Sequence, residues 1–148
     1  MTSPWLTRPV TQHDASTIAQ HRFFNPQEDP GDLASYARWV DTRIGAGSYI
    51  GSVAEVNGEV IGGAGATLLD WGPTRGGRGP IKARIVNVYT MPSWRGRGVS
   101  RCLVEHVLAR CQAMGIGDFC LSHTAASRHL YASLGFVTSD VEMFRRAE

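Results

Sequence analysis

The chain has 148 residues, of which 43% are hydrophobic, and its fifteen basic and thirteen acidic side chains give a net charge of +2. This length suffices for one well-buried core and is too short for two domains of ordinary size, so we expect a single domain over residues 1–148. The near balance of charge argues against general binding to nucleic acid or to a membrane surface. No leader-like pattern and no apolar run of about 18 residues occurs, which predicts a soluble cytoplasmic protein.

The cysteines point to a reducing compartment. Cys102, Cys111 and Cys120 are an odd number without a Cys-x-x-Cys pair, which argues against a disulfide framework and against a tetrahedral zinc site. We therefore expect no metal centre. Cys102 and Cys111 fall in a helical pattern and are interpreted as small buried hydrophobic side chains.

The first third of the chain predicts one strand and two helices. Residues 5–10 read as a short strand, and Thr11-Gln12-His13-Asp14 reads as a capping box for a helix that ends by Asn25-Pro26. The acidic stretch 25–32 is predicted to be a loop. A second helix follows to Gly45, because apolar residues recur at helical spacing: Leu33, Tyr36, Ala37, Val40 and Ile44.

A β-hairpin is the strongest expectation for the middle of the chain. Asn57-Gly58 separates two β-rich runs, 49–56 and 60–69, and this dipeptide is the typical two-residue hairpin turn. Three glycines in the second run, Gly62, Gly63 and Gly65, indicate either a bulge and tight packing or a functional close approach. The glycine-rich, basic stretch 71–80 is predicted to be a loop.

The second half alternates strands and helices. We predict a central strand over 82–91, a helix over 98–114 closed by Gly115, a short buried strand over 119–121, a helix over 125–134 and a last strand over 136–145. The predicted order is β-α-α-β-β-β-α-β-α-β. This order indicates an α/β fold with a mixed, largely antiparallel sheet and helices on both faces.

The segment Val88-Tyr89-Thr90-Met91-Pro92-Ser93-Trp94-Arg95-Gly96-Arg97-Gly98-Val99-Ser100 is interpreted as a phosphate cradle. Gly96 and Gly98 lack the Cβ atoms that would keep an anion away, and the helix that follows presents free N–H groups. Arg95, Arg97 and Arg101 add positive charge. A nucleotide P-loop would need Gly-Lys-Ser/Thr, and a dinucleotide fingerprint would need glycine in place of Arg101.

Two motifs together resemble the GNAT superfamily of acetyl-coenzyme A dependent N-acetyltransferases. Arg95-Gly96-Arg97-Gly98-Val99-Ser100 is similar to its Gln/Arg-x-x-Gly-x-Gly/Ala loop, with Ser100 as a small departure, and Tyr131-Ala132-Ser133-Leu134-Gly135-Phe136 resembles its Tyr-x-x-x-Gly-Phe segment. The resemblance is strongest over residues 85–136. It implies a GNAT-like fold and acetyl-CoA as the co-substrate.

The resemblance also implies site residues. Backbone groups of Val88, Tyr89 and Thr90 are expected to bind the thioester and the pantetheine arm, and a fixed N–H there would stabilise the charge that develops during acyl transfer. The side chain of Tyr89 is either a cleft residue or a packed aromatic. Thr124 stands where some members have an asparagine that contacts the cofactor arm. The cofactor set is completed by the loop: Arg95, Gly96, Arg97, Gly98, Val99 and Ser100.

Tyr131 is expected to donate a proton to the departing thiolate, and it is also a candidate core tyrosine beside Leu134 and Phe136. No carboxylate matches the base of some family members, because Arg84 and Phe119 occupy those strand positions. His123 is the candidate base, since its usual pKa lies near working pH.

Weaker candidates for the base are His129, Asp70 and a chain of water. The remaining histidines are interpreted as surface residues on helices: His13, His21 and His106.

We therefore expect an N-acetyltransferase whose acceptor amine attacks the thioester directly in a ternary complex. The acceptor is a small-molecule or protein amine, and Glu28, Asp29 and Asp32 form either an ordinary solvated loop or a site that attracts its positive charge. The alternatives are a non-catalytic acyl-CoA sensor and an RNA-binding module that uses basic residues near the glycines. Nucleic acid and membrane are not expected as partners, and the resemblance allows a homodimer.

Overall fold

The computed structural model describes residues 4–24, 31–73 and 79–147. Its elements follow the predicted order as far as the last helix. They are strand β1 (Leu6–Pro9), 3₁₀ turn η1 (Gln12–Asp14), helices α1 (Ala15–Arg22) and α2 (Gly31–Gly45), strands β2 (Tyr49–Val56), β3 (Glu59–Asp70) and β4 (Ile81–Thr90), 3₁₀ turn η2 (Pro92–Trp94), helix α3 (Val99–Ala113), strand β5 (Asp118–Cys120) and helix α4 (Arg128–Ser133).

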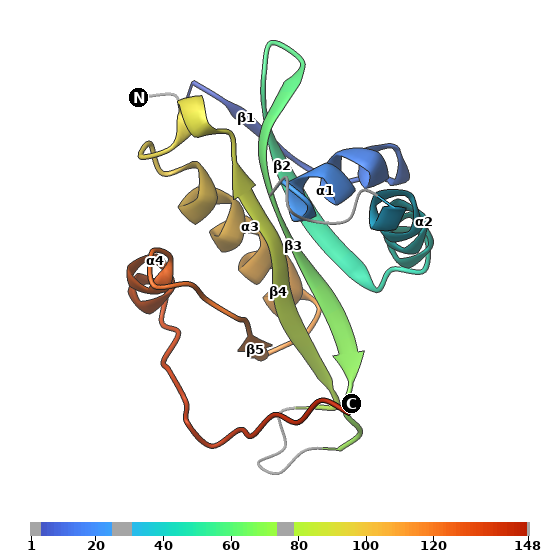
Figure 1. Cartoon of the computed structure of the whole chain (residues 1–148), viewed down its shortest axis with the longest axis vertical. Helices are drawn as coiled ribbons and strands as arrows, with labels where there is room; N and C mark the ends of the chain where they lie inside the picture. The colour runs from blue at the N-terminus through green and yellow to red at the C-terminus, as the bar shows by residue number, and fades with distance from the viewer. Residues whose placement is uncertain (1–3, 25–30, 74–78, 148) are drawn as a thin grey trace.

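The five strands form one sheet in chain order, β1-β2-β3-β4-β5. The first four pair antiparallel, and β5 lies parallel to β4. Parallel neighbours need a crossover connection, which α3 supplies. Helices α1 and α2 lie on one side of the sheet and α3 lies on the other (Figure 1). The predicted mixed, largely antiparallel sheet with helices on both faces is therefore confirmed.

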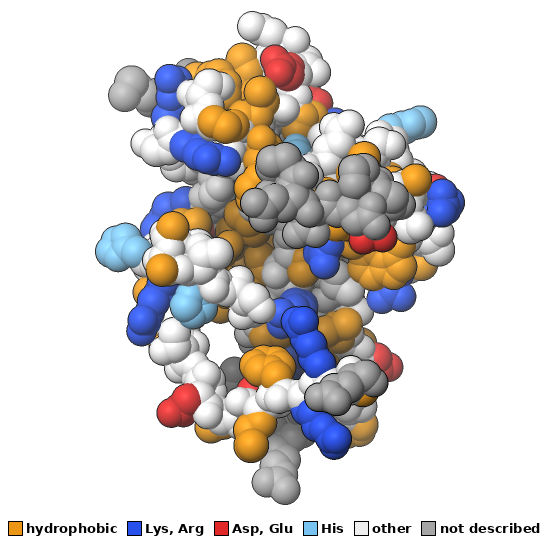
Figure 2. Space-filling view, viewed as in Figure 1, with side chains coloured by type: hydrophobic (Ala, Val, Ile, Leu, Met, Phe, Trp, Pro, Cys, Tyr) orange, Lys and Arg blue, Asp and Glu red, His pale blue; other side chains and the backbone are white. Residues whose placement is uncertain are grey.

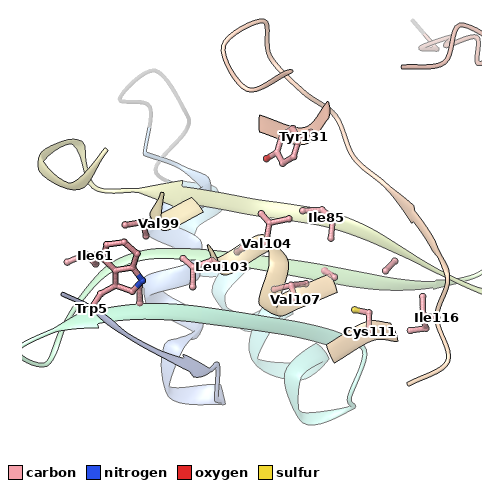
Figure 3. Close-up of a cluster of buried hydrophobic side chains, with 14 residues drawn as sticks. Trp5, Ile61, Ile85, Val99, Leu103, Val104, Val107, Cys111, Ile116 and Tyr131 are labelled. Atoms are coloured by element: carbon pink, nitrogen blue, oxygen red, sulfur yellow. The ribbon is translucent and has the colours of Figure 1, made fainter. Parts of the chain in front are cut away.

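Each face of the sheet has its own hydrophobic cluster. Between the sheet and α3, apolar residues of the helix such as Leu103, Val104 and Val107 pack against Ile61 and Ile85 (Figure 3). On the opposite face, Val40 of α2 and Ile18 of α1 pack with Tyr49. Because the side chains of a strand alternate between the two faces, the central strands contribute to both clusters.

The predicted hairpin is confirmed. Asn57 and Gly58 both have positive φ angles, of 50° and 80°, as a type I′ turn requires. The glycines of β3 serve tight packing, which was one of the two interpretations. A Cβ at Gly65 would overlap the Tyr49 hydroxyl, and one at Gly63 would lie 2.9 Å from Nδ1 of His21.

The predicted strand over 136–145 is wrong. Residues 136–147 form no helix or strand. A cavity of about 540 Å³ separates this segment from the open edge of β5, which has only three residues in the sheet. Without a partner strand, the segment leaves four large apolar side chains 83–95% exposed: Val137, Val141, Met143 and Phe144.

Candidate active site

A β-bulge in β4 marks the site. Gly63 of β3 pairs with Tyr89 and Gly65 pairs with Val86, so Asn87 and Val88 together face only one residue of β3. Asn87 adopts a φ of +57°, unusual for a residue with a side chain. Its amide Nδ2 donates to the hydroxyls of Tyr36 at 2.8 Å and Tyr49 at 3.0 Å. These hydrogen bonds hold the bulge in place.

The opposite edge of β4 is open beside the bulge. Strand β5 pairs only with residues 82–84 of β4, so within the described residues the backbone from Ile85 to Thr90 has no strand neighbour on that side. The structure thus leaves the edge of Val88, Tyr89 and Thr90 uncovered by β5. This is the edge to which the resemblance assigned the thioester arm.

The glycine-rich turn leads directly into α3. Gly96 and Gly98 have φ angles of 77° and 83°, and a Cβ at either position would meet no atom within 4 Å. Gly98 is the residue that caps α3, and its carbonyl accepts from the N–H of Cys102 at 3.0 Å. The N–H groups of the first turn, which include those of Val99 and Ser100, precede the first intrahelical donor. The turn therefore presents open space next to free amides.

Side chains of the loop and of the end of β4 stabilise the turn through hydrogen bonds and a cation–π contact. The hydroxyls of Thr90 and Ser100 lie 2.6 Å apart, and Nε of Arg95 donates to the Thr90 carbonyl at 3.1 Å. The Arg97 guanidinium lies 4.8 Å from the centroid of the Trp94 ring. The partners of these two guanidinium groups are a carbonyl and an aromatic ring, which are neutral, so these contacts do not cancel the positive charges. Arg101 instead pairs with Glu105 at 3.2 Å.

A cavity of about 460 Å³, which we call the β4 cavity, lies beside the open edge of β4. It is bounded by the end of α1, the bulged part of β4 and the segment that leads into α4. Its lining residues are His21, Arg22, Phe23, Phe24, Ile85, Val86, Asn87, Val88, Ser122, Thr124, Ser127 and Tyr131. The structure thus brings Val88, Thr124 and Tyr131 together, three residues that the sequence placed in the site.

Tyr131 is a packed core side chain that also borders the β4 cavity. The side chain is buried in the α3-side cluster, and its ring meets Phe136 edge-on with centroids 6.0 Å apart. It also lines the β4 cavity. Burial raises the pKa of Tyr131, so the phenol keeps its proton at neutral pH and remains available as a donor.

Thr124 is tied to the start of α4. Its N–H donates to Oγ of Ser127 at 2.9 Å, and the N–H of Ser127 returns a hydrogen bond to Oγ1 of Thr124 at 3.2 Å. The Thr124 carbonyl accepts from the N–H of Arg128 at 3.1 Å. Thr124 therefore stabilises the turn that places Tyr131, besides lining the cavity.

The candidate bases are scattered. His123 is exposed, its Nδ1 lies 3.1 Å from the Thr124 carbonyl, and it lines the cavity of about 540 Å³ next to β5 instead of the β4 cavity. Asp70 ends β3, where its carboxylate accepts from the N–H of Gly72 at 2.9 Å. His129 lines neither cavity. The structure brings none of these three into the β4 cavity.

His21 is the residue that the sequence interpretation misplaced. His13 and His106 are exposed, as predicted, but His21 is only 7% exposed, stacks on Tyr89 with ring centroids 4.7 Å apart and lines the β4 cavity. Burial lowers its pKa from 6.5 to about 4. Its position three residues after Ile18, on the buried face of α1, was the signal that could have revealed it.

Tyr89 is a packed aromatic, one of the two alternatives considered. Besides its contact with His21, its ring lies 5.5 Å from that of Phe24 at a tilt of 41°. Tyr89 is not among the residues that line the β4 cavity, and its ring packs against His21 of α1. The backbone of Tyr89 remains at the open edge of the strand.

The remaining predicted features lie partly outside the described residues. Glu28 and Asp29 of the acidic loop do, as do Arg75 and Arg78 of the basic loop, whereas Asp32 is exposed in the first turn of α2. Within the described ranges, no three His, Cys, Asp or Glu side chains group as metal ligands. Nor does any helix there have the length and apolar composition to cross a membrane.

The glycine turn fits a pyrophosphate. Gly96 and Gly98 have left-handed backbones with open space where a side chain would stand, and the free amides of the first turn of α3 and two arginines, Arg95 and Arg97, belong to the same stretch. The β4 cavity lies at the unpaired edge of the strand that leads into this turn, where Val88 lines it. Such a site is suited to hold a phosphate-bearing carrier with its acyl end in the cavity.

Comparison with known proteins agrees with this class of site. Residues 13–136 match the model of the acetyltransferase (GNAT) family. The chain therefore belongs to the GNAT family, and it is an acyltransferase of that family. No curated protein matches the chain by sequence.

Several solved structures share the fold. A predicted acetyltransferase from Clostridium acetobutylicum with acetyl-CoA is 21% identical, with a TM-score of 0.87 and 96% of each chain covered. A GCN5-related N-acetyltransferase from Ralstonia eutropha is 28% identical, with a TM-score of 0.82 over 97% of this chain and 98% of that one. AAC(6')-Iy in complex with the bisubstrate analogue CoA-S-monomethyl-acetylneamine is 17% identical, with a TM-score of 0.76 and 99% of each covered.

Proposed function

We propose that this protein transfers the acetyl group of acetyl-CoA to the nitrogen of an amine acceptor, in a ternary complex and without a covalent enzyme intermediate. The observation that carries the proposal is that strand β4 lines the β4 cavity with Val88 and then leads into the glycine turn at Gly96 and Gly98, while Tyr131 lines the same cavity. The acetyl-CoA in one similar structure and the bisubstrate analogue in another support it.

The loop residues would bind and orient the donor. Amides of the first turn of α3, together with Arg95 and Arg97, would hold the pyrophosphate, and the open edge of β4 would hold the arm. Bound acetyl-CoA supplies an activated acyl group. A backbone N–H at the bulge, fixed by the hydrogen bonds of Asn87, would stabilise negative charge at the reacting carbonyl oxygen.

Tyr131 would protonate the departing thiolate. Its raised pKa keeps the phenol protonated, and its place in the lining of the β4 cavity supports this role. Direct attack is favoured over a covalent route, because none of the three cysteines lines the β4 cavity. Cys111 is buried, and burial raises the pKa of its thiol, which makes it a poor nucleophile.

We assign no side chain as general base. His21 lines the cavity, but its pKa of about 4 makes it far too weak a base for an ammonium group of pKa near 10. The acceptor would therefore react as the free amine that exists in solution. The rate constant kcat/KM should then rise about tenfold per pH unit until the pKa of the acceptor is reached.

The test is calorimetric titration with acetyl-CoA of the parent protein, a Gly98→Glu variant and a Gly47→Glu control. Gly47 likewise has a positive φ, of 76°, and no atom within 4 Å of an added Cβ, but it lies two residues after the end of α2. We expect micromolar binding by the parent and the control, and loss of binding in Gly98→Glu. Absence of binding by the folded parent would refute both the transferase and the acyl-CoA sensor, whereas binding without transfer to any amine would favour the sensor.

A further inference from the structure

The α1 end of the β4 cavity carries a positive charge that the acetyl donor does not use. Among the lining residues, Arg22 is the one with a full charge at neutral pH, since His21 is neutral and no Asp or Glu of the described chain lines the cavity. Arg22 lies at the end of α1, across the cavity from Tyr131 of α4. The cavity therefore has a proton donor at one wall and a cation at another.

The Arg22 guanidinium is held by neutral groups. Its Nη1 lies 3.3 Å from Oδ1 of Asn87 and 3.5 Å from the Tyr36 hydroxyl, and its central carbon lies 4.6 Å from the centroid of the Tyr36 ring. Asn87 is itself fixed by Tyr36 and Tyr49. In the described part of the chain no carboxylate pairs with Arg22. Among the described residues, neutral groups position this charge and none neutralises it.

A second guanidinium flanks the cavity. Nη2 of Arg84 donates to Oγ of Ser122 at 2.7 Å, and Ser122 lines the cavity. Arg84 likewise has no carboxylate partner among the described residues. Lys and Arg side chains gather in the middle of this face of the molecule, where β4 runs (Figure 2). A ligand in the β4 cavity would therefore lie in a positive field.

We propose that the acceptor is a compact amine that also carries an anionic group, a carboxylate or a phosphate, and that Arg22 is the specificity-determining residue that binds this group. A guanidinium binds either anion through two parallel hydrogen bonds. Phe23 and Phe24 beside Arg22 would contact an apolar body. The inference rests on the proposed function, and it names the class of acceptor for the same site.

The experiment is a thiol-release assay with saturating acetyl-CoA and matched acceptors. Phenylalanine is compared with phenylalaninamide, and phosphoethanolamine with ethanolamine, so that the two pairs distinguish carboxylate from phosphate. Every kcat/KM is calculated for the concentration of free amine, because the anionic group also raises the pKa of the amine. We expect the anionic member of one pair to have a kcat/KM at least tenfold higher. Calorimetry with 3-phenylpropionate and with methyl phosphate reports anion binding without turnover.

The variants are Arg22→Gln and Arg22→Lys, with Arg38→Gln as the control. Arg38 is exposed on α2, and among the described residues its guanidinium hydrogen bonds only to Oγ of Ser35, at 3.4 Å. Arg22→Gln should lower kcat/KM for the preferred anionic acceptor by 10- to 100-fold, mainly through KM, and leave the neutral partner within about twofold. Arg22→Lys should retain part of the preference, and Arg38→Gln should match the parent.

The outcomes separate the two proposals. Equal or better use of the neutral acceptors, or an equal effect of Arg22→Gln on both members of a pair, would overturn the inference and leave the proposed function intact. Absence of transfer to every amine, with acetyl-CoA still bound, would refute the proposed function and this inference with it. Thermal melting of each variant excludes misfolding as the cause of a lost activity.

Discussion

The side chain of Tyr131 is buried in the α3-side cluster and also lines the β4 cavity. The substitution Tyr131→Phe removes only its hydroxyl group. Because the ring packing against Phe136 is retained, we expect the fold to be unchanged. Loss of the proton donor should lower kcat by about 10²-fold or more while the Kd for acetyl-CoA stays the same. Steady-state kinetics and calorimetry test this. An unchanged kcat would show that Tyr131 only packs.

His21 should make stability depend on pH. Its pKa in the folded protein is about 4, below its usual 6.5, so the unfolded chain binds a proton between these values that the folded chain does not. Stability should therefore fall as pH drops from 6.5 to 4, by on the order of 3 kcal/mol. Urea unfolding at pH 7.5 and 4.5 tests this. His21→Gln should reduce the difference, while the exposed His106→Gln should not.

Gly65 has no room for a side chain. An added Cβ would overlap the hydroxyl of Tyr49, whose ring is buried against α2, so Gly65→Ala should lower the free energy of unfolding by about 1–3 kcal/mol. Gly117→Ala is the control, because a Cβ there meets nothing within 4 Å. Thermal unfolding compares the two. Equal stability of both variants would contradict the packing interpretation.

The site could be predicted where residues adjacent in sequence create it. The cradle at Gly96 and Gly98 was found because its glycines, the strand before it and the helix after it are consecutive. His21 and Arg22 were missed, because their role depends on α1 packing across β4, which no local pattern specifies. His123 was chosen for its strand-end position, but the chain turns at Thr124 and directs it toward the other cavity.

Strand β1, turn η1 and strand β2 are joined by an ion-pair network around Arg8. Asp14, 5% exposed, accepts two hydrogen bonds from Arg8 at 2.8 Å, and Arg8 also donates to Glu55 at 2.8 Å. Arg8 lowers the pKa of Asp14. Asp14→Ala should lower the free energy of unfolding by about 2–4 kcal/mol, since it leaves Arg8 without its main partner. Glu105→Gln, in an exposed pair with Arg101, should cost at most about 0.5 kcal/mol.

Most helices and strands were predictable because each has its own signal. The spacing of Leu33, Tyr36 and Val40, the Asn57-Gly58 turn and the stop at Gly115 all act within a few residues. The segment 136–145 shows the limit of such signals. A local sequence pattern predicts only that a segment can form a strand. A strand also needs a partner, and a cavity lies between this segment and β5.

Residues 137–147 are exposed, and we expect a protease to reach them easily. No backbone hydrogen bond to another part of the described chain holds residues 137–147. Limited digestion with chymotrypsin should therefore cleave rapidly after Phe144, which is 89% exposed, and leave the α1–α4 body folded. Mass spectrometry of the products measures this. Protection of that bond would show that the segment pairs with something in solution.

Every strand of the sheet lies next to the strand that precedes it in the chain. This strand order influences the sequence of events in folding. Strands β2, β3 and β4 are joined by local connections, and closing such short loops costs little conformational entropy. Only β5 must wait for the α3 crossover. We expect β2, β3 and β4 to gain protection first in pulsed hydrogen exchange, so that the β4 cavity is completed last, when β5 and α4 arrive.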